Sequence, residues 1–416
     1  EMFIKGGMFL SSFSLFDVIG PIMHGPSSNH TGGAVRLGYY ANQIIGGTPK
    51  KITFAFHPLF MKMFTGHRTH IALMAGCLGM REDDKKVNDA KSIIISKKIK
   101  ISYKAVREKN PDRNIMRISG NYDGLDWVIN GISVGGGNIV IDSINGISTK
   151  ISGNSHIYFY RLQNEINLKD ITKIIKVLDI NGLCDKDGYS FYFSTLFELP
   201  SEDMKALEKL LAVNIVLQRH IKPLHIFSEK VVCKPLFTTF KELEKICQGQ
   251  DIAEAAITYE MKRSKTSRTQ ILHEAMKIVE VEESAIKQGL KGNVNLIGGF
   301  IGNSDGKLAQ EWSTNNHSIA GNVLNMAMAR ALAVSSINAC AGIVVATPTC
   351  GSSGTLPGTL FTVAERYGKS HEVLAKAFLV AAALGTIVGN KSSFSGSIGG
   401  CQVEIGVAAA IGAGAS

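Results

Sequence analysis

The feature that most constrains this chain is the abundance of small apolar residues in its final part. Two stretches, 322–348 (NVLNMAMARALAVSSINACAGIVVATP) and 377–389 (AFLVAAALGTIVG), are rich in Ala, Gly, Val and Leu and carry few charges. Helices of this composition pack closely against neighbours on all sides. The second stretch is too short and too poor in bulky residues to span a bilayer, so we expect a buried helix there. The sequence therefore predicts an all-α domain over residues 235–416.

The first part of the chain mixes helical and strand patterns with glycine turns, which predicts an α+β domain. Strands are expected at KITFAFHPLFMKMF (51–64) and at SIIISKKIKISYKAV (92–106), and helices at AVRLGYYANQII (34–45) and THIALMAGCLGM (69–80). A triple-glycine turn and a hairpin are expected within ISVGGGNIVIDSINGISTKIS (132–152).

The region from about 150 to 225 alternates between strand and helix patterns. The predicted order is strand, helix, strand, helix, strand, at 156–162, 168–178, 189–199, 201–211 and 213–220. Such alternation in a short region is typical of a ferredoxin-like regulatory module. No catalytic cluster is apparent in it.

Composition excludes several classes of protein. With 45% hydrophobic and 19% charged residues, a chain of 416 residues is globular rather than disordered. The net charge of +10 is moderate, and its densest basic clusters, at 97–104 and 262–268, are interpreted as solvated faces rather than a nucleic-acid-binding surface. Seven scattered cysteines without a CxxC pair argue against a zinc ribbon or a disulfide scaffold and favour a reducing cytoplasm. No secretory signal is recognisable at the start.

Three polar loops stand out among these apolar elements. They are GPSSNHTGG (25–33), TPTCGSSGTLPG (347–358) and GNKSSFSGSIGGCQVEIG (389–406). Each alone is explained by helix capping and turns. Together they also fit the lips of a concave site, in which backbone N–H groups and hydroxyls hold an anion beside a titratable imidazole. The residues alone leave both interpretations open.

Cysteine and histidine supply the reactive candidates. Cys401 follows two glycines and opens a predicted helix, a position that lowers a thiol pKa and favours thiolate chemistry or metal ligation, although a lone cysteine is more often a small buried group. Cys340 and Cys350 are interpreted as structural. His67 and His70 flank the turn before the helix at 69–80, and His30 lies in the first loop.

Five motifs together resemble the iron–sulfur L-serine dehydratases: GPSSNHT, GHRTHIALMAG, ISVGGG, NACAGIVVATPTCGSSGTLPGTLFTVAERYG and SFSGSIGGCQVEIG. The likeness runs from about residue 14 to the end and is densest after 320. The chain resembles in particular the form of this family that is divided into a β portion with an ACT-like module and an α portion, and here both portions are fused. The resemblance implies a β-type domain at 1–148, an ACT-like ferredoxin-fold module at 149–228 and an all-α catalytic domain at 235–416.

The resemblance implies a lyase that converts L-serine to pyruvate and ammonia in amino-acid catabolism and gluconeogenesis. The family uses a [4Fe–4S] cluster with one open iron, and Cys401 is similar to its first cluster ligand. His67 and His30 match the family's catalytic histidines, and we favour His67 as the base. The substrate would be held by Ser27, Ser28, Thr31, Thr349, Gly351, Ser352, Ser353, Gly354, Asn390, Ser393, Ser395 and Gly396.

Three departures from the family pattern qualify this expectation. The family's other two cluster cysteines would lie beyond Ser416, so the sequence is expected to be incomplete at its C-terminus. The segment KNPDRNIMRI (109–118) lacks the histidine of a His-Pro-Asn-Thr motif, and GHRTH carries Arg68 and His70 where a small residue and an acid are expected.

The partners that we expect are L-serine, or threonine as another hydroxy amino acid, and a second copy in a homodimer. We expect neither nucleic acid nor membrane as a partner. One alternative is a non-catalytic relative that binds an amino acid through the ACT-like module, and a more remote one is a pyridoxal-phosphate-dependent dehydratase.

Overall fold

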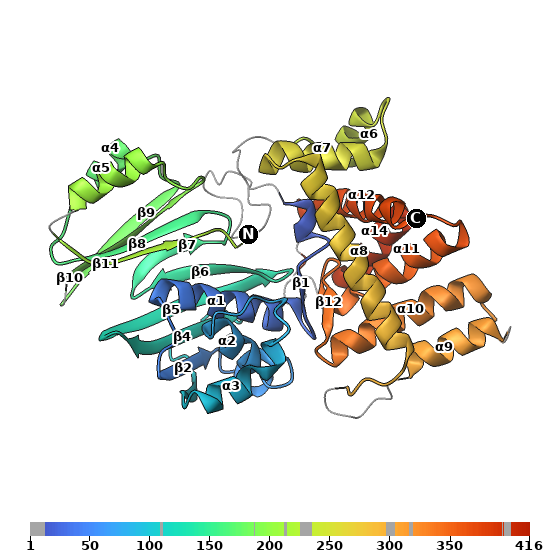
Figure 1. Cartoon of the computed structure of the whole chain (residues 1–416), viewed down its shortest axis with the longest axis horizontal. Coiled ribbons are helices and arrows are strands. Elements are labelled where there is room, and N and C mark those ends of the chain that lie inside the picture. The colour runs from blue at the N-terminus through green and yellow to red at the C-terminus, as the bar shows by residue number, and fades with distance from the viewer. Residues whose placement is uncertain are drawn as a thin grey trace.

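The computed structural model describes residues 13–416 apart from 109–110, 187, 212–213, 225–234, 297–303, 316–318, 393 and 395–400, and apart from the side chain of Cys401. Figure 1 shows a six-stranded sheet covered by helices, a four-stranded sheet above it, and a helical part on the other side of the molecule. A two-stranded sheet of β1 and β12 lies between the sheets and the helical part.

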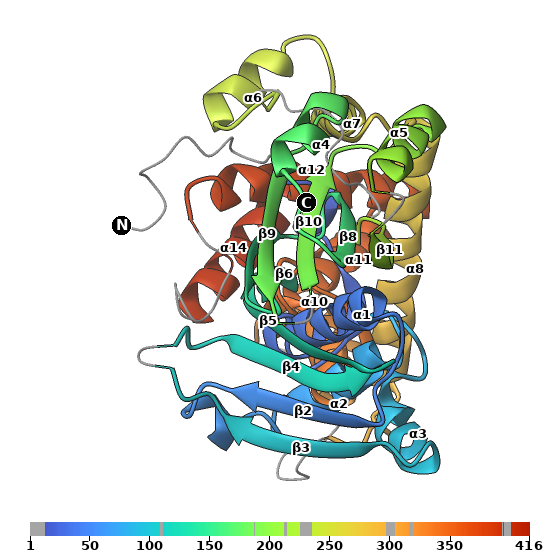
Figure 2. The same cartoon turned by 90° about the vertical axis from the view of Figure 1, so that its left-hand side faces the viewer.

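The six-stranded sheet has the order β3-β2-β4-β5-β6-β7, with β2 and β3 parallel and the other neighbours antiparallel. Its strands are β2 (Lys51–Phe56), β3 (Lys100–Ala105), β4 (Ile115–Tyr122), β5 (Leu125–Gly135), β6 (Asn138–Ile144) and β7 (Ile147–Ile151). The last three contain the triple-glycine turn and the hairpin that were predicted at 132–152. Figure 2 shows β2, β3 and β4 side by side at the outer end of this sheet.

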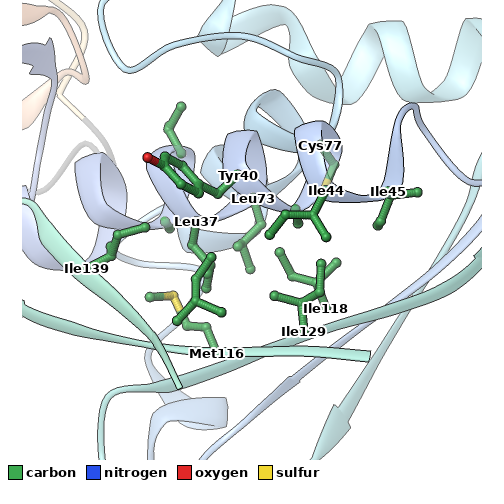
Figure 3. Packing of buried hydrophobic residues seen from close by; sticks show 14 of the residues in the cluster. Leu37, Tyr40, Ile44, Ile45, Leu73, Cys77, Met116, Ile118, Ile129 and Ile139 are labelled. Atoms are coloured by element: carbon green, nitrogen blue, oxygen red, sulfur yellow. The ribbon is translucent and has the colours of Figure 1, made fainter. Parts of the chain in front are cut away.

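Helices α1 (Gly33–Ile45) and α2 (Thr69–Cys77) cover one face of this sheet, and both were predicted. Figure 3 shows Leu37 and Ile44 of α1 packed against Ile118 and Ile129 of the sheet. The two helices can approach this closely only because residue 76 is glycine: a Cβ at this position would lie 2.1 Å from the carbonyl oxygen of Val35.

Two strand predictions in this region were too long. The segment SIIIS belongs to helix α3 (Ala90–Ser96), and only the following β3 is a strand. Ala90 and Ile94 are buried one helical turn apart while Ile95 is 66% exposed, so the isoleucine run has one buried helical face. Likewise the strand predicted at 51–64 ends at Phe56, and a 3-10 turn follows at Phe60–Lys62.

The four-stranded sheet has the element order β8-α4-β9-β10-α5-β11 and the antiparallel strand order β11-β8-β10-β9. Its elements are β8 (His156–Leu162), α4 (Leu168–Ile174), β9 (Asp179–Asp185), β10 (Gly188–Thr195), α5 (Ser201–Leu211) and β11 (Ile215–Ile221). Strand β9 was missed because its sequence, DINGLCD, shows no strand pattern. The helices cover one face, and Phe159 on the other face contacts Trp127 of the six-stranded sheet, with ring centroids 5.6 Å apart.

The helical part was predicted in outline. It contains α6 (Phe240–Ile246), α7 (Ile252–Ser264), α8 (Arg268–Leu290), α9 (Asp305–Thr314), α10 (Asn322–Ala339), α11 (Thr355–Arg366), α12 (His371–Gly389) and α14 (Cys401–Ala415). By length and composition alone α12 could cross a membrane, yet 56% of its most apolar window is buried inside the protein. Phe378 and Leu379 are fully buried in the helical core, as expected for the run 377–389.

The helical part is not purely α, which corrects the prediction. Its strand β12 (Ile343–Val345) pairs antiparallel with β1 (Ile22–His24) from the start of the chain, with Met23 opposite Val344. The segment before β1 also packs into the helical core, where the Ser14 hydroxyl donates to Glu260 over 3.0 Å. A strand of three residues is too short to show a period in the sequence.

Candidate active site at the junction of the two parts

The first polar loop, here called the first lip (residues 25–33), forms a helical turn after β1. The Ser27 hydroxyl accepts a hydrogen bond from the His30 N–H over 3.1 Å, so Ser27 caps the π-helical turn Ser28–Gly32 that leads into α1. Thr31 accepts from the Ser27 N–H over 3.3 Å. The predicted capping role is therefore confirmed, and the anion-binding role stays a prediction.

The first lip carries His30 to His67, which lies just before α2. The Thr31 hydroxyl donates to the His67 carbonyl oxygen over 2.7 Å, and the two imidazole ring centroids are 4.9 Å apart. The next residue, Arg68, has a left-handed backbone with φ of 54°. His70, by contrast, lies inside α2 and its ring packs on Phe64.

The chemistry of this pair is set by its surroundings. Burial, assisted by the neighbouring His67 charge, lowers the pKa of His30 to about 4, although a hydrogen bond with Asn114 opposes the shift. His30 is therefore neutral at physiological pH. The His67 Nδ1 atom is buried and has no hydrogen-bond partner among the described residues. A neutral imidazole beside an unpartnered ring nitrogen can accept a proton or orient a ligand.

The second polar loop, here called the second lip (residues 347–354), follows β12. Within it the hydroxyls of Thr349 and Ser352 lie 3.2 Å apart, and Ser352 also donates to the Thr347 carbonyl oxygen over 3.1 Å. The lip lies against α10, since a Cβ on Gly354 would be 2.2 Å from the Ala331 carbonyl oxygen. The hydroxyl oxygen of Ser353 is buried and has no partner in the described part of the chain.

The structure brings the two lips together through one side chain. The Asn338 amide, in the last turn of α10, donates to the Pro26 carbonyl oxygen over 3.2 Å and to the Cys350 carbonyl oxygen over 3.0 Å. The loop that carries Ser27, Ser28, His30 and Thr31, with His67 bonded to it, thus meets the loop that carries Thr349, Gly351, Ser352, Ser353 and Gly354. That these residues form one substrate site stays a prediction.

The third predicted loop is only partly described. Asn390 ends α12, outside this network of hydrogen bonds, and its buried Nδ2 atom has no partner among the described residues. Ser393, Ser395 and Gly396 lie outside the described residues. Cys401 begins α14 as predicted, but its side chain is not described, so its distance from the histidines stays a prediction.

Four residues near the lips were missed by the sequence interpretation. They are Asn29, Asn114, Asn338 and Glu404. The side-chain oxygen Oδ1 of Asn29 is buried and has no partner among the described residues. Glu404 lies one helical turn after Cys401, where burial raises its pKa and a hydrogen bond with Thr349 opposes the shift. An available signal for Asn338 was its place as a polar residue in an almost uncharged helix.

A [4Fe–4S] cluster needs a set of thiolates, and the described residues do not assemble one. Throughout the described part of the chain, no three His, Cys, Asp or Glu side chains gather as metal ligands. Burial raises the pKa of the Cys350 thiol well above its usual range, and its sulfur lies 3.4 Å from that of Met23. Burial also raises the pKa of Cys340. Both are therefore poor thiolate ligands, which agrees with their structural interpretation.

Unpartnered buried polar atoms gather around the lips. In the described residues these are Asn29 Oδ1 and Ser353 Oγ in the lips, Asn338 Oδ1 between them, and His67 Nδ1, Thr69 Oγ1 and His70 Nδ1 around the start of α2. Buried polar groups in proteins are nearly always hydrogen-bonded, so such a concentration indicates a polar ligand that completes the network. The arrangement combines donors, acceptors and a neutral imidazole, which suits proton transfer to and from a small polar substrate.

Comparisons with known proteins identify relatives of both parts. Residues 247–416 match the family model described as serine dehydratase alpha chain. The chain is 36% identical over 141 residues to the "Probable L-serine dehydratase, beta chain" of Bacillus subtilis (strain 168), covering 34% of this chain and 64% of that one.

Two alpha chains match as well. The "Probable L-serine dehydratase, alpha chain" of the same organism is 32% identical over 182 residues, covering 43% of this chain and 60% of that one. The "L-serine dehydratase, alpha chain" of Peptoniphilus asaccharolyticus is 32% identical over 186 residues, covering 43% and 62%. The chain thus spans about three fifths of the length of each of these relatives. This protein thus combines, in one polypeptide, similarity to a serine dehydratase beta chain and similarity to serine dehydratase alpha chains.

Proposed function

We propose that this protein is an L-serine ammonia-lyase. It removes the α-proton and the β-hydroxyl of L-serine as water, which leaves aminoacrylate, and aminoacrylate tautomerises and hydrolyses to pyruvate and ammonia. The observation that carries the proposal is the His30–His67 pair, in which His67 Nδ1 has no partner among the described residues and His30 lies on the loop that Asn338 bonds to the alpha-like part. The names of the relatives support the substrate.

In this reaction His67 accepts the α-proton on its unpartnered Nδ1 atom, and His30 stays neutral and orients the substrate. The neutral state of His30 supports these roles, because a positively charged ring 4.9 Å from the His67 ring would oppose transfer of a proton to His67. Hydrogen-bond reach to the α-carbon proton is the geometric requirement for such a base.

The substrate carboxylate lies between the two lips. Ser353 contacts it directly, because its hydroxyl is buried and has no partner among the described residues, and Gly351 and Gly354 of the same lip offer backbone N–H groups to it. The Thr31 and Ser352 hydroxyls already donate to backbone carbonyl oxygens, so they hold the lips in shape. The Ser27 hydroxyl only accepts a bond, so its proton is offered to the substrate, and Ser28 and Thr349 complete this set. Asn390, Ser393, Ser395 and Gly396 complete the wall.

The cofactor in this proposal is a [4Fe–4S] cluster with Cys401 as one ligand. The described residues do not complete a ligand set for it. What supports Cys401 is its place at the start of α14, whose next turn carries Glu404 to the second lip.

The four-stranded unit is proposed as an ACT-like ferredoxin-fold module over residues 149–228. Its β-α-β-β-α-β element order and antiparallel strand order support this fold. The β-type domain at 1–148, the helical catalytic domain at 235–416, a cytoplasmic location and a homodimer without nucleic-acid or membrane partners belong to the same proposal.

The test is pyruvate formation from L-serine by protein prepared anaerobically with iron and sulfide. We expect visible absorption of an iron–sulfur cluster and release of pyruvate and ammonia in equal amounts, with L-threonine as the competing substrate. Colourless protein that forms no pyruvate contradicts the proposal. If such protein were still stabilised against heat by L-serine, the alternative of an amino-acid-binding relative would replace it.

A further inference from the structure

Asn338 lies between the two lips and is hydrogen-bonded to both of them. It lies in the last turn of α10, and its side chain is only 9% exposed. Its amide nitrogen donates two hydrogen bonds, one to a carbonyl oxygen of each lip, at Pro26 and at Cys350. A single NH₂ group thus connects the loop that carries His30 with the loop that carries Ser353.

The first lip transmits this contact to His67. Next to Pro26, the Ser27 N–H donates to the Thr31 hydroxyl over 3.3 Å, and that hydroxyl donates to the His67 carbonyl oxygen over 2.7 Å. Three hydrogen bonds and one peptide unit therefore lead from Asn338 to His67: Asn338 to Pro26, then the Pro26–Ser27 peptide, Ser27 to Thr31, and Thr31 to His67. This series connects the helical part to the backbone of the proposed base.

The packing leaves the Asn338 side chain no freedom to move toward the first lip. A Cβ on Gly25 would lie 2.2 Å from the Asn338 carbonyl oxygen and 2.3 Å from its side-chain oxygen, so the lip can approach this closely only with glycine at this position. The Asn338 Oδ1 atom has no partner among the described residues. The side chain is therefore held by its two donated bonds and by Gly25.

We propose that Asn338 is a positioning residue that sets the distance between the two lips and thereby the placement of His67 relative to substrate held by the second lip. The inference rests on the proposed function for its kinetic consequence. The structural consequence, that Asn338 holds the two lips together, does not depend on the proposed function, because the lips are held together whether or not serine is the substrate.

The experiment compares Asn338→Asp with Asn88→Asp. Aspartate keeps the shape of Asn338 but replaces the donor with an oxygen that repels both carbonyl groups. Asn88 is the matched control: its amide crosses the same junction, donates to the Ala341 carbonyl oxygen over 3.0 Å and lies 3.3 Å from His24 Nδ1, so its hydrogen-bond partners lie outside both lips. Should Asn338→Asp not fold, Asn338→Ala, which only removes the donor, takes its place.

Two measurements are made on each full-length variant. In Asn338→Asp we expect kcat/KM for L-serine to fall by about 100-fold, mostly in kcat, because misplacing a catalytic group by about 1 Å costs that much. Amide hydrogen exchange should become faster in residues 27–32 and stay unchanged in α7 and α8. Asn88→Asp should keep kcat/KM within about twofold.

The inference is overturned if Asn338→Asp keeps kcat/KM within about twofold, if Asn88→Asp loses as much, or if exchange rises throughout the molecule rather than in the first lip. Failure of the proposed function looks different. The unaltered protein would then form no pyruvate, and the exchange measurement alone would decide whether Asn338 holds the lips.

Discussion

Two pairs of neighbouring histidines in the described part of the chain differ in what surrounds them. At the junction, the rings of His30 and His67 lie 4.9 Å apart, and His67 Nδ1 has no partner among the described residues. In the four-stranded unit, His156 Nδ1 and His220 Nε2 share a hydrogen bond of 3.1 Å, and the His220 ring is stacked on Tyr158 with centroids 4.4 Å apart.

The difference separates a structural pair from a reactive one. In the four-stranded unit the ring nitrogens bond to one another and lie near Glu198, 3.9 Å from His220, so the pair ties β8 to β11. At the junction one nitrogen is left over in a buried setting, which a protein tolerates when a ligand supplies the partner. The two pairs consist of the same residue type, so the sequence does not distinguish them. The hydrogen-bond partners of their ring nitrogens do.

The largest expected effect is on activity at the junction. Replacing His67 with Gln should reduce the rate of pyruvate formation from L-serine by about 1,000-fold, because a positioned general base contributes a factor of this order. His156→Gln should leave the rate unchanged. A His67→Gln variant that keeps more than a tenth of the activity would remove His67 from the role of base.

The second effect is on stability, and it depends on pH. The pKa of His30 is about 4 when folded, against 6.5 ordinarily, so between these values the unfolded chain binds a proton that the folded protein does not. The free energy of unfolding is therefore fully present above pH 6.5 and falls by up to about 3 kcal/mol as the pH is lowered to 4. Urea unfolding at several pH values measures it.

His30→Asn should flatten this pH dependence. His220→Asn is the control in the four-stranded unit, where burial also lowers the pKa of His220 but Glu198 opposes the shift, so its effect should be smaller. Equal slopes in the two variants would mean that the two pairs are not electrostatically different.

A smaller effect distinguishes two neighbouring serines of the second lip. Ser353→Ala should raise KM for L-serine about tenfold with no loss of stability, because its hydroxyl has no partner among the described residues and is proposed to bond to the substrate. Ser352→Ala should cost about 1 kcal/mol of unfolding free energy, because it removes the bond to Thr347. Steady-state kinetics and thermal unfolding of both variants check this, and a reversed pattern would exchange their roles.

The smallest effect is expected in the four-stranded unit. His220→Gln removes the bond to His156 at a solvent-exposed position, so it should change the unfolding free energy by less than about 1 kcal/mol and leave kcat/KM for L-serine unaltered. A change in kcat/KM measured for this variant would show that the four-stranded unit communicates with the junction.

Much of the fold follows from local sequence patterns. The helices at 34–45 and 69–77, the hairpins around the triple glycine and the buried helix near the end were all predictable, because apolar periodicity and glycine turns act over a few residues. The capping role of Ser27 was predictable for the same reason. The isoleucine run at 93–95 and strand β9 were not, since a short run fits helix and strand equally well and β9 has no apolar alternation.

The candidate site was predictable only as separate polar loops. The sequence by itself determined which loops carry histidine, hydroxyl groups and glycine, because these types are needed locally for caps, turns and proton transfer. Only the tertiary structure decided that the first and second lips meet, through the pairing of β1 with β12 and the two bonds of Asn338. The physical reason is that contacts between residues more than 300 positions apart depend on how whole elements pack, and three-residue strands and a single amide leave no periodic signal.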